Sequence, residues 1–333
     1  MKKMFTTVLT GAFAAIAGFA FAEDFKPAVI YDMGGKFDKS FNEGVYNGIQ
    51  KFSDETGVKV MEFEVTNEAQ RQQAMEKMVQ RGATVVLGVG FAQADAISTV
   101  AAANPDVKFS IIDVSWLDLP NLLQYAFKEQ ECSYLVGMAA AMASKTGKVG
   151  FVGGMDIPLI RAFGCGYEQG VKAVNADAEV LQNMTGTTPA AWNDPTKGAE
   201  LTQAQIDRGA DVIYQAAGGT GVGVLQAAAD AGKLSIGVDS NQNYIHPGSV
   251  LTSMLKRVDV AAYETMKDAM SGNFDTGVRI LGVKEGGVGW ALDEHNAGLI
   301  TDEMKAAIDA ASDKISSGEI MVHDFRSDNT CKM

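Results

Sequence analysis

The stretch TVVLGVGFAQADAISTVAAANPDVKFSIIDV, residues 84–114, contains the pattern that decides the fold. Residues 84–89 form a continuous apolar run, residues 93–103 carry apolar side chains at helical spacing, and residues 107–114 are again largely apolar. A strand, a helix and a second strand in this order make one unit of a parallel sheet. Strands without polar alternation are typical of sheets that helices cover on both faces. The stretch therefore predicts a doubly wound α/β layer.

The same alternation of strands and helices extends in both directions and falls into two consecutive sets. Two sets of similar size predict two Rossmann-like lobes, because a chain of 333 residues is too long for one ordinary core. The first set has expected strands at 28–31, 58–65, 84–89, 107–114 and 122–127 and helices around 45–52, 67–82 and 93–103; the second has strands at 149–152, 178–183, 212–215, 235–238 and 250–255 and helices at 129–145, 159–174, 197–208 and 223–231.

The last part of the chain is expected to connect the two lobes. It supplies one more helix, one more strand and a final helix, which we interpret as a crossing to the first lobe and a return to the second. The predicted N-terminal lobe is 23–127 plus 256–280, and the predicted C-terminal lobe is 128–255 plus 281–333. Several crossing strands would form the hinge between them.

The N-terminus has the features of a secretory leader. A positively charged start is followed by apolar or small residues over 4–21, and Ala20-Phe21-Ala22 has the small-x-small form of a cleavage site. We expect cleavage after Ala22. An uncut leader would anchor the protein in a membrane and still place it outside the cytoplasm. No cysteine follows the cleavage site directly, which favours a soluble periplasmic protein over a lipid-anchored one.

The charge of the chain excludes some classes of partner. The formal net charge is −13, and loss of Lys2 and Lys3 with the leader makes it −15. An acidic chain without a basic run is unsuited to nucleic acid or to an anionic membrane surface. A small-molecule ligand is compatible with this charge, because its site can carry local charges of its own. We expect a monomer.

The cysteines and histidines indicate neither a metal site nor a cofactor. Cys132, Cys165 and Cys331 are an odd number, and the three histidines lie on separate segments without metal-ligand spacing. Two alternatives remain for the first two cysteines: a Cys132–Cys165 disulfide in an oxidising compartment, or two small buried thiols. The pattern assigns no role to Cys331.

Three acidic residues follow directly after predicted strands. They are Asp32, Asp113 and Asp239. Ligands of open α/β sheets bind beyond the carboxyl ends of the strands, so these carboxylates are candidates for a binding cleft. Each could instead cap the helix that follows, but three in corresponding places favour the cleft. Neighbouring carboxylates would suit a ligand with several hydrogen-bond donors, such as sugar hydroxyls or amines.

Two aromatic residues near these positions could contribute to the same cleft. Phe41 follows Asp32 in a glycine-rich loop, and Tyr214 precedes the glycine cluster at 218–221. Rings from opposite lobes could sandwich a flat heterocycle. An ordinary buried strand aromatic is an equal alternative for Tyr214.

A dehydrogenase is the main competing interpretation, and its motif fails. Residues 212–239 supply a strand, a glycine cluster, a helix, a strand and an acid, as in a dinucleotide-binding fold. A GxGxxG motif starting at Gly219 would require glycine at Val224. The motifs GxSxG, HExxH and GxxxxGK[ST] are also absent from the sequence. We therefore expect a binding protein rather than an enzyme. An acid placed to hold a ribose remains compatible with a nucleoside ligand.

Six ordered motifs resemble the basic membrane protein family, also described as purine-nucleoside-receptor-like substrate-binding proteins of ABC transporters. The resemblance covers essentially the whole chain after the leader. It implies the type I periplasmic-binding-protein fold with a three-strand hinge, and a purine nucleoside ligand delivered to a transporter permease. The motifs are DMGGKFDKSFN (32–42), FKEQECSYLVG (127–137), AAGGTG (216–221), GVDSNQ (237–242), SMLKRVD (253–259) and GGVGWALDEHN (286–296).

The resemblance also implies roles for residues of the first lobe. Asp32 and Asn42 would contact the base, and Phe41 would stack on it. Asp113 would face the 5′ side of the ribose.

On the second lobe, the resemblance implies that Tyr214 stacks on the other face of the base, at a position where the family often has phenylalanine. Asp239 would accept hydrogen bonds from the ribose 2′- and 3′-hydroxyls, and Lys256 would donate to the ribose. Gly218 and Gly219 would let the backbone approach the ligand closely.

Two departures from the family pattern are Cys132 in place of glycine and Tyr214 in place of phenylalanine. Trp192 and Arg161 lie where type I proteins sometimes contact ligand, but we interpret both as packing or surface residues. Riboflavin or a simple sugar is the alternative ligand within the same fold. A secreted nucleoside-processing enzyme is the alternative from another class.

Overall fold

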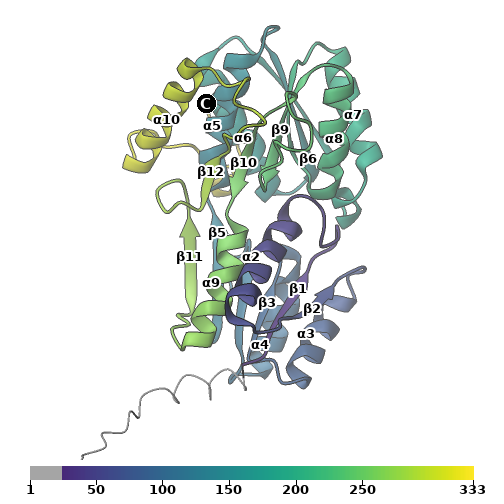
Figure 1. Ribbon diagram of the computed structural model, residues 1–333, viewed down its shortest axis with the longest axis vertical. Helices are drawn as coiled ribbons and strands as arrows, with labels where there is room; N and C mark the ends of the chain where they lie inside the picture. The colour runs from purple at the N-terminus through teal and green to yellow at the C-terminus, as the bar shows by residue number, and fades with distance from the viewer. Residues whose placement is uncertain (1–24) are drawn as a thin grey trace, which may run out of the picture.

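The computed structural model describes residues 25–333. The expected leader and its cleavage site lie outside these residues. Over the described part of the chain, no helix combines the length and the apolar character needed to cross a membrane. The molecule is elongated and has two lobes, one above the other in Figure 1.

The first lobe is built on a six-stranded sheet in the order β11-β5-β4-β3-β1-β2, in which all neighbouring strands are parallel. Five of its strands, β1 to β5, come from the N-terminal part of the chain, and β11 returns from much later. The elements are β1 (Pro27–Tyr31), α2 (Phe41–Thr56), β2 (Met61–Glu64), α3 (Gln70–Gln80), β3 (Val85–Gly88), η1 (Phe91–Gln93), α4 (Ala94–Ala103), β4 (Lys108–Ile112), β5 (Leu122–Phe127), α9 (Val258–Ser271) and β11 (Gly277–Leu281).

The second lobe repeats this plan with a sheet in the order β12-β10-β9-β8-β6-β7. All its neighbours are parallel except the edge strand β12, which pairs antiparallel with β10. The elements are α5 (Glu129–Ala143), β6 (Lys148–Met155), α6 (Pro158–Val174), β7 (Glu179–Gly186), η2 (Pro189–Trp192), α7 (Pro195–Asp207), β8 (Val212–Ala216), η3 (Gly218–Thr220), α8 (Gly221–Asp230), β9 (Leu234–Asp239), β10 (Val250–Lys256), β12 (Val288–Trp290), α10 (Asp302–Ser317) and η4 (Phe325–Ser327).

The predicted fold of two doubly wound lobes is therefore confirmed. Its central strands are buried on both faces; β1, β3 and β8 are buried along their whole length. This burial explains why their sequences lack polar alternation.

The chain passes between the two lobes three times, after β5, after β10 and after β11. Figure 1 shows β5 and β11 rising toward the waist of the molecule and α9 leading down from it into the lower lobe. The Lys128 amide donates to the Leu281 carbonyl oxygen (3.0 Å), and the Arg257 amide donates to the Gly287 carbonyl oxygen (2.8 Å). These bonds tie the crossing segments to the strands and loops beside them.

Helices α5 and α6 pack very closely because glycines face the partner helix. A Cβ atom added at Gly170 would lie 1.9 Å from the Tyr134 carbonyl oxygen, and one added at Gly137 would lie 2.2 Å from that of Tyr167. Only residues without a side chain permit this distance between backbones. The pair packs against the second sheet.

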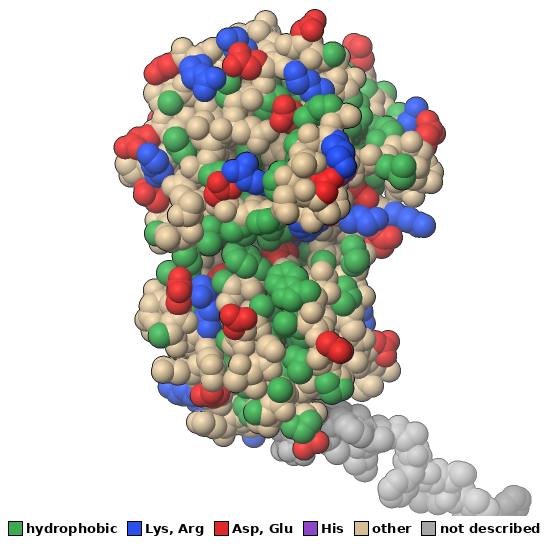
Figure 2. All heavy atoms as spheres, turned by 180° about the vertical axis from the view of Figure 1, so that it is seen from behind, with side chains coloured by type: hydrophobic (Ala, Val, Ile, Leu, Met, Phe, Trp, Pro, Cys, Tyr) green, Lys and Arg blue, Asp and Glu red, His purple; other side chains and the backbone are tan. Residues whose placement is uncertain are grey.

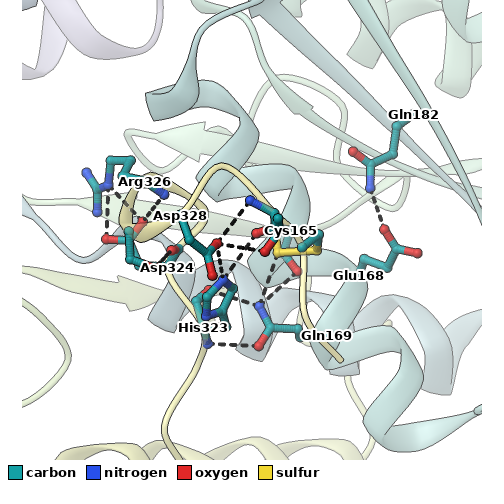
Figure 3. The surroundings of a disulfide bond; sticks show 11 residues. Cys165, Glu168, Gln169, Gln182, His323, Asp324, Arg326 and Asp328 are labelled. Carbon is teal, nitrogen blue, oxygen red and sulfur yellow. Dashed lines mark hydrogen bonds and ion pairs between the residues drawn. A yellow bond between two sulfur atoms is a disulfide. The ribbon is translucent and has the colours of Figure 1, made fainter.

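The disulfide of this structure joins Cys165 on α6 to Cys331 near the C-terminus, with the Cα atoms 5.4 Å apart (Figure 3). A Cys132–Cys165 bond is therefore wrong, and so is the alternative of two free thiols. Cys132 alone matches that alternative: it is buried and unpaired, and its thiol donates to the Gly289 carbonyl oxygen (2.6 Å). The two residues differ because Cys165 faces the C-terminal tail, whereas Cys132 faces β12.

Candidate functional site

A cavity lies between the lobes at the carboxyl ends of both sheets. It encloses about 600 Å³ of space free of protein atoms, part of it open to solvent. Figure 2 shows hydrophobic side chains gathered at the waist where the lobes meet. The lining residues are Asp32, Met33, Asp38, Phe41, Asn42, Gly90, Phe91 and Asp113 from the first lobe, and Leu159, Ile160, Phe163, Trp192, Ala216, Gly218, Val238, Asp239 and Lys256 from the second.

All three strand-end acids line this one cavity. Asp32 follows β1, Asp113 follows β4, and Asp239 ends β9. Asp113 and Asp239 both adopt the left-handed backbone conformation, with φ of 69° and 62°. Non-glycine residues adopt it at an energetic cost, and such strain concentrates at functional sites. The strand ends thus turn these two carboxylates inward.

Lys256 lies among the acids as a buried cation. Its Nζ is 2.6 Å from Asp113 Oδ1 and 3.0 Å from Glu129 Oε1. Burial opposes the charged form, but the carboxylates of Asp113, Glu129 and Asp239 hold the pKa of Lys256 above its usual range. Because Lys256 belongs to the second lobe and Asp113 to the first, their ion pair joins the lobes.

Burial also affects the acids. It raises the pKa of Asp113 to about 6, with Lys256 opposing the shift and Glu129 adding to it. It raises the pKa of Asp239 to about 6, opposed by Lys256 and by a hydrogen bond from Ser40. Both carboxylates therefore change charge close to neutral pH.

Asp32 has a cationic partner of its own. Arg71 of α3 donates from Nη2 to Asp32 Oδ1 (3.0 Å), and both side chains are buried. Burial raises the pKa of Asp32 in spite of this cation. The carboxylate is therefore anchored by Arg71 while it faces the cavity.

The loop before α2 positions Phe41 and Asn42. Asp38 accepts hydrogen bonds from the backbone amides of Ser40 (2.8 Å), Asn42 (3.0 Å) and Glu43 (3.1 Å), which satisfies free donors at the start of the helix. The Asn42 side chain donates to Asp38 (3.2 Å). Phe41 then faces the cavity, with its ring centroid 5.1 Å from Lys256 Nζ.

Hydrogen bonds join the lobes at the rim of the cavity. Ser40 Oγ donates to Asp239 Oδ2 (2.6 Å), and Ser240 Oγ donates to the Ser40 carbonyl oxygen (2.8 Å). Gln242 Nε2 donates to the Lys39 carbonyl oxygen (2.9 Å). The structure is therefore in a closed arrangement.

Two of the expected site residues do not line the cavity. Tyr214 has no exposed surface and packs against Phe151 and Tyr167, with ring centroids 5.4 and 5.1 Å away. Strand β8 continues to Ala216, so Tyr214 is not at its end and its side chain points into the core. Gly219 is also outside the lining, whereas Gly218 is part of it.

The aromatic wall of the second lobe is made by Phe163 and Trp192 instead. Trp192 ends the short η2 turn, and a Cβ added at Gly154 would lie 2.1 Å from its ring, so its indole rests on bare backbone of β6. Its interpretation as a packing or surface residue needs correction, since it also lines the cavity. Arg161 pairs with Asp156 (2.6 Å) and is not in the lining.

The residues that sequence reasoning missed came from positions without a strand-end signal. Arg71 is in the first turn of a polar helix, and Phe163 is one apolar residue among several on α6. Glu129, in the first turn of α5, has no exposed surface at all. Asp38 was also missed, and it is the one residue with a recognisable signal: an acid just before a helix, where it can cap the free amides.

Comparison with known proteins places the chain in a family. Residues 25–325 match the family model described as ABC transporter substrate-binding protein PnrA-like. The chain is 32% identical to basic membrane protein A2 of Borrelia garinii subsp. bavariensis over 93% of this chain and 92% of that protein. It is 33% identical to the ABC transporter nucleoside-binding protein BmpA of Lactococcus lactis subsp. cremoris, over 90% and 89%.

A solved structure gives the same result. The ABC transporter solute-binding protein of Aeropyrum pernix superposes with a TM-score of 0.82 at 30% identity, over 90% of this chain and 93% of that one. Proteins of this kind bind small molecules outside the cytoplasm, act with a transporter permease and are not enzymes. The two-lobed fold, the cavity between the lobes and the family match over nearly the whole described chain agree: this protein belongs to the PnrA-like, or basic membrane protein, family of ABC transporter substrate-binding proteins.

Proposed function

We propose that this protein captures a purine nucleoside in the cavity between its lobes and presents it to the permease of an ABC importer. The observation that carries the proposal is the convergence of three strand-end carboxylates and a buried lysine with aromatic rings on one cavity. Its lining combines apolar and aromatic side chains with a few convergent polar groups, as small-molecule sites do. A relative is named as nucleoside-binding, which supports the same ligand class.

Both the base and the ribose of a nucleoside would have suitable side-chain partners in the cavity. The base would lie against Phe41 and the second-lobe rings, with Asp32 and Asn42 at its polar edge. The ribose hydroxyls would donate to Asp239, and Lys256 would donate to ribose oxygens. Asp113 would face the 5′ side. Gly218 would allow backbone to approach the ligand.

The mechanism is hinge closure. A ligand that contacts both lobes stabilises the closed form, because only there are all its contacts made. We propose that the lobes are 23–127 plus 256–280 and 128–255 plus 281–333, adjusted at two residues so that Lys256 stays with β10 in the second lobe and Leu281 with β11 in the first. We also propose that the protein is a periplasmic monomer released from its leader after Ala22. Transport energy would come from a separate cytoplasmic ATPase.

Thermal unfolding with added ligand tests the proposal. Adenosine, guanosine or inosine at about 100 times its dissociation constant is expected to stabilise the folded protein by about 2.7 kcal/mol, which raises the melting temperature. Ribose alone is the matched control for the sugar half. Absence of a shift with all three nucleosides would contradict the proposal. A shift with riboflavin or a simple sugar instead would assign the alternative ligand.

An enzyme assay separates binding from catalysis. Protein incubated with inosine is expected to return it intact, as analysed by chromatography for free base. Release of hypoxanthine would show a nucleoside-processing enzyme. Mass spectrometry of small molecules that copurify with the native protein would identify the ligand directly.

A further inference from the structure

The C-terminal tail, residues 319–333, reaches the binding site through one side chain. The disulfide Cys165–Cys331 fixes the tail to α6. Beside it, Gln169 donates to the His323 carbonyl oxygen (3.0 Å) and accepts from the His323 amide (2.8 Å). Figure 3 shows these contacts on one side of the tail and Arg326 on the other. The tail is therefore attached to the second lobe along its length.

Arg326 points from the tail toward the first hinge crossing. Its Nη1 is 2.9 Å from Glu129 Oε2, and its Nη2 donates to the Phe127 carbonyl oxygen (3.0 Å). Asp324 accepts from Arg326 Nε (2.9 Å) and orients the guanidinium. The side chain lines a second cavity that shares Asp113 with the ligand cavity.

Glu129 connects this arginine to the ligand site. Its Oε2 faces Arg326, and its Oε1 is 3.0 Å from Lys256. In the part of the chain that the structure describes, the buried carboxylate has these two cations and no other hydrogen-bond donor. A buried carboxylate needs compensation, so loss of either cation increases the demand on the other.

The acids that face this region outnumber the cations. The three acids around Lys256 have two cations among them, which leaves one excess negative charge. Without Arg326 the excess becomes two, and Lys256 is then the sole cation for Glu129 while it also pairs with Asp113. The groups concerned are Asp113 after β4, Glu129 on α5, Asp239 on β9, Lys256 on β10 and Arg326 on the tail, with Asp38 near Asp239 and Asp324 beside Arg326.

We propose that Arg326 is a positioning residue of the ligand site: by sharing the neutralisation of Glu129 with Lys256, it keeps Lys256 paired with Asp113 and available to the ligand, and so sets the pH range of binding. This inference rests on the proposed nucleoside function. The tail is then a structural part of the site, although it does not touch the ligand.

The pH profile of nucleoside affinity tests this role. Ionised Asp113 and Asp239 are needed to accept from the ligand, so binding is expected to weaken as pH falls through about 6. In Arg326→Met these acids lose a stabilising cation. The pH below which nucleoside binding weakens is therefore expected to rise by about one unit. Arg326→Lys keeps the charge and should restore most of the wild-type profile. Arg208→Met, at an exposed ion pair with Glu179, is the matched control.

The double variant Glu129→Gln/Arg326→Met distinguishes positioning from mere structural support. It removes one charge of each sign, so its profile is expected to match wild type even though the arginine is missing. It also keeps the test decisive if Arg326→Met does not fold, because no unpaired buried carboxylate remains. An unchanged profile in Arg326→Met, or an upward shift in the double variant, would overturn the inference.

A ligand-free measurement separates this inference from the proposed function. Carboxyl carbon NMR of Asp113 and Asp239 is expected to show titration midpoints higher in Arg326→Met than in wild type, and restored in the double variant. If wild type binds no nucleoside, the proposed function fails while this titration still decides the role of Arg326. Equal midpoints in all three proteins would refute it.

Discussion

At Asp239, the proposed role in binding is expected to come at the expense of stability. Its carboxylate is buried, its backbone is left-handed, and burial raises its pKa from the ordinary 3.8 to about 6. Between these values the folded protein keeps a proton that the unfolded chain has lost. The contribution of Asp239 to the free energy of unfolding therefore decreases as pH rises from about 4 to about 6. Nucleoside affinity is expected to increase as pH rises through about 6, where the folded protein loses this proton.

Replacement Asp239→Asn is expected to separate the two effects. Asparagine has the same shape and tolerates the left-handed backbone, so the melting temperature above pH 6 should stay the same or rise. Loss of a charged acceptor for ribose hydroxyls should weaken nucleoside binding about ten- to a hundredfold. Calorimetric titration and thermal unfolding measure both quantities. Exposed Asp177→Asn is the control, and equal loss of stability and affinity would mean that Asp239 is structural.

At the scale of elements, the α5–α6 pair determines how firmly the second lobe is held. Gly170→Ala would force a methyl group against the backbone of Tyr134. Overpacking of this kind is expected to lower the free energy of unfolding by about 1–3 kcal/mol, measured by urea denaturation. Gly298→Ala adds the same methyl group where nothing lies within 4 Å and should be nearly neutral. Similar stabilities for the two variants would show that α5 can move away at little cost.

The elements also show which parts of the site could be predicted from sequence. Asp32, Asp113 and Asp239 were predictable because buried parallel strands are easy to recognise and their ends converge in space. Of the two alternatives for Tyr214, the structure shows the buried strand aromatic, because β8 pairs with β6 as far as Ala216 and Tyr214 lies within the strand. Partners such as Arg71 and the Cys165–Cys331 bond join distant segments, and no local pattern specifies them.

The molecule as a whole is expected to alternate between open and closed forms. The closed form has few polar contacts between the lobes, chiefly Ser40 to Asp239 and Lys256 to Asp113, and a ligand would add more. Small-angle X-ray scattering should therefore show a smaller radius of gyration when nucleoside is added to ligand-free protein. Asp239→Asn at the same nucleoside concentration should contract less. An identical radius with and without bound nucleoside would contradict hinge closure.

The three crossings of the chain also determine how the gene can be divided. Neither sheet is encoded by one unbroken stretch, because β11 belongs to the first sheet and lies more than a hundred residues after β5. A fragment that stops at Phe127 would leave β5 as a bare edge open to aggregation, and would also lack α9. Exchange of a lobe with a relative, to transplant its ligand preference, therefore requires two coding segments to be moved together.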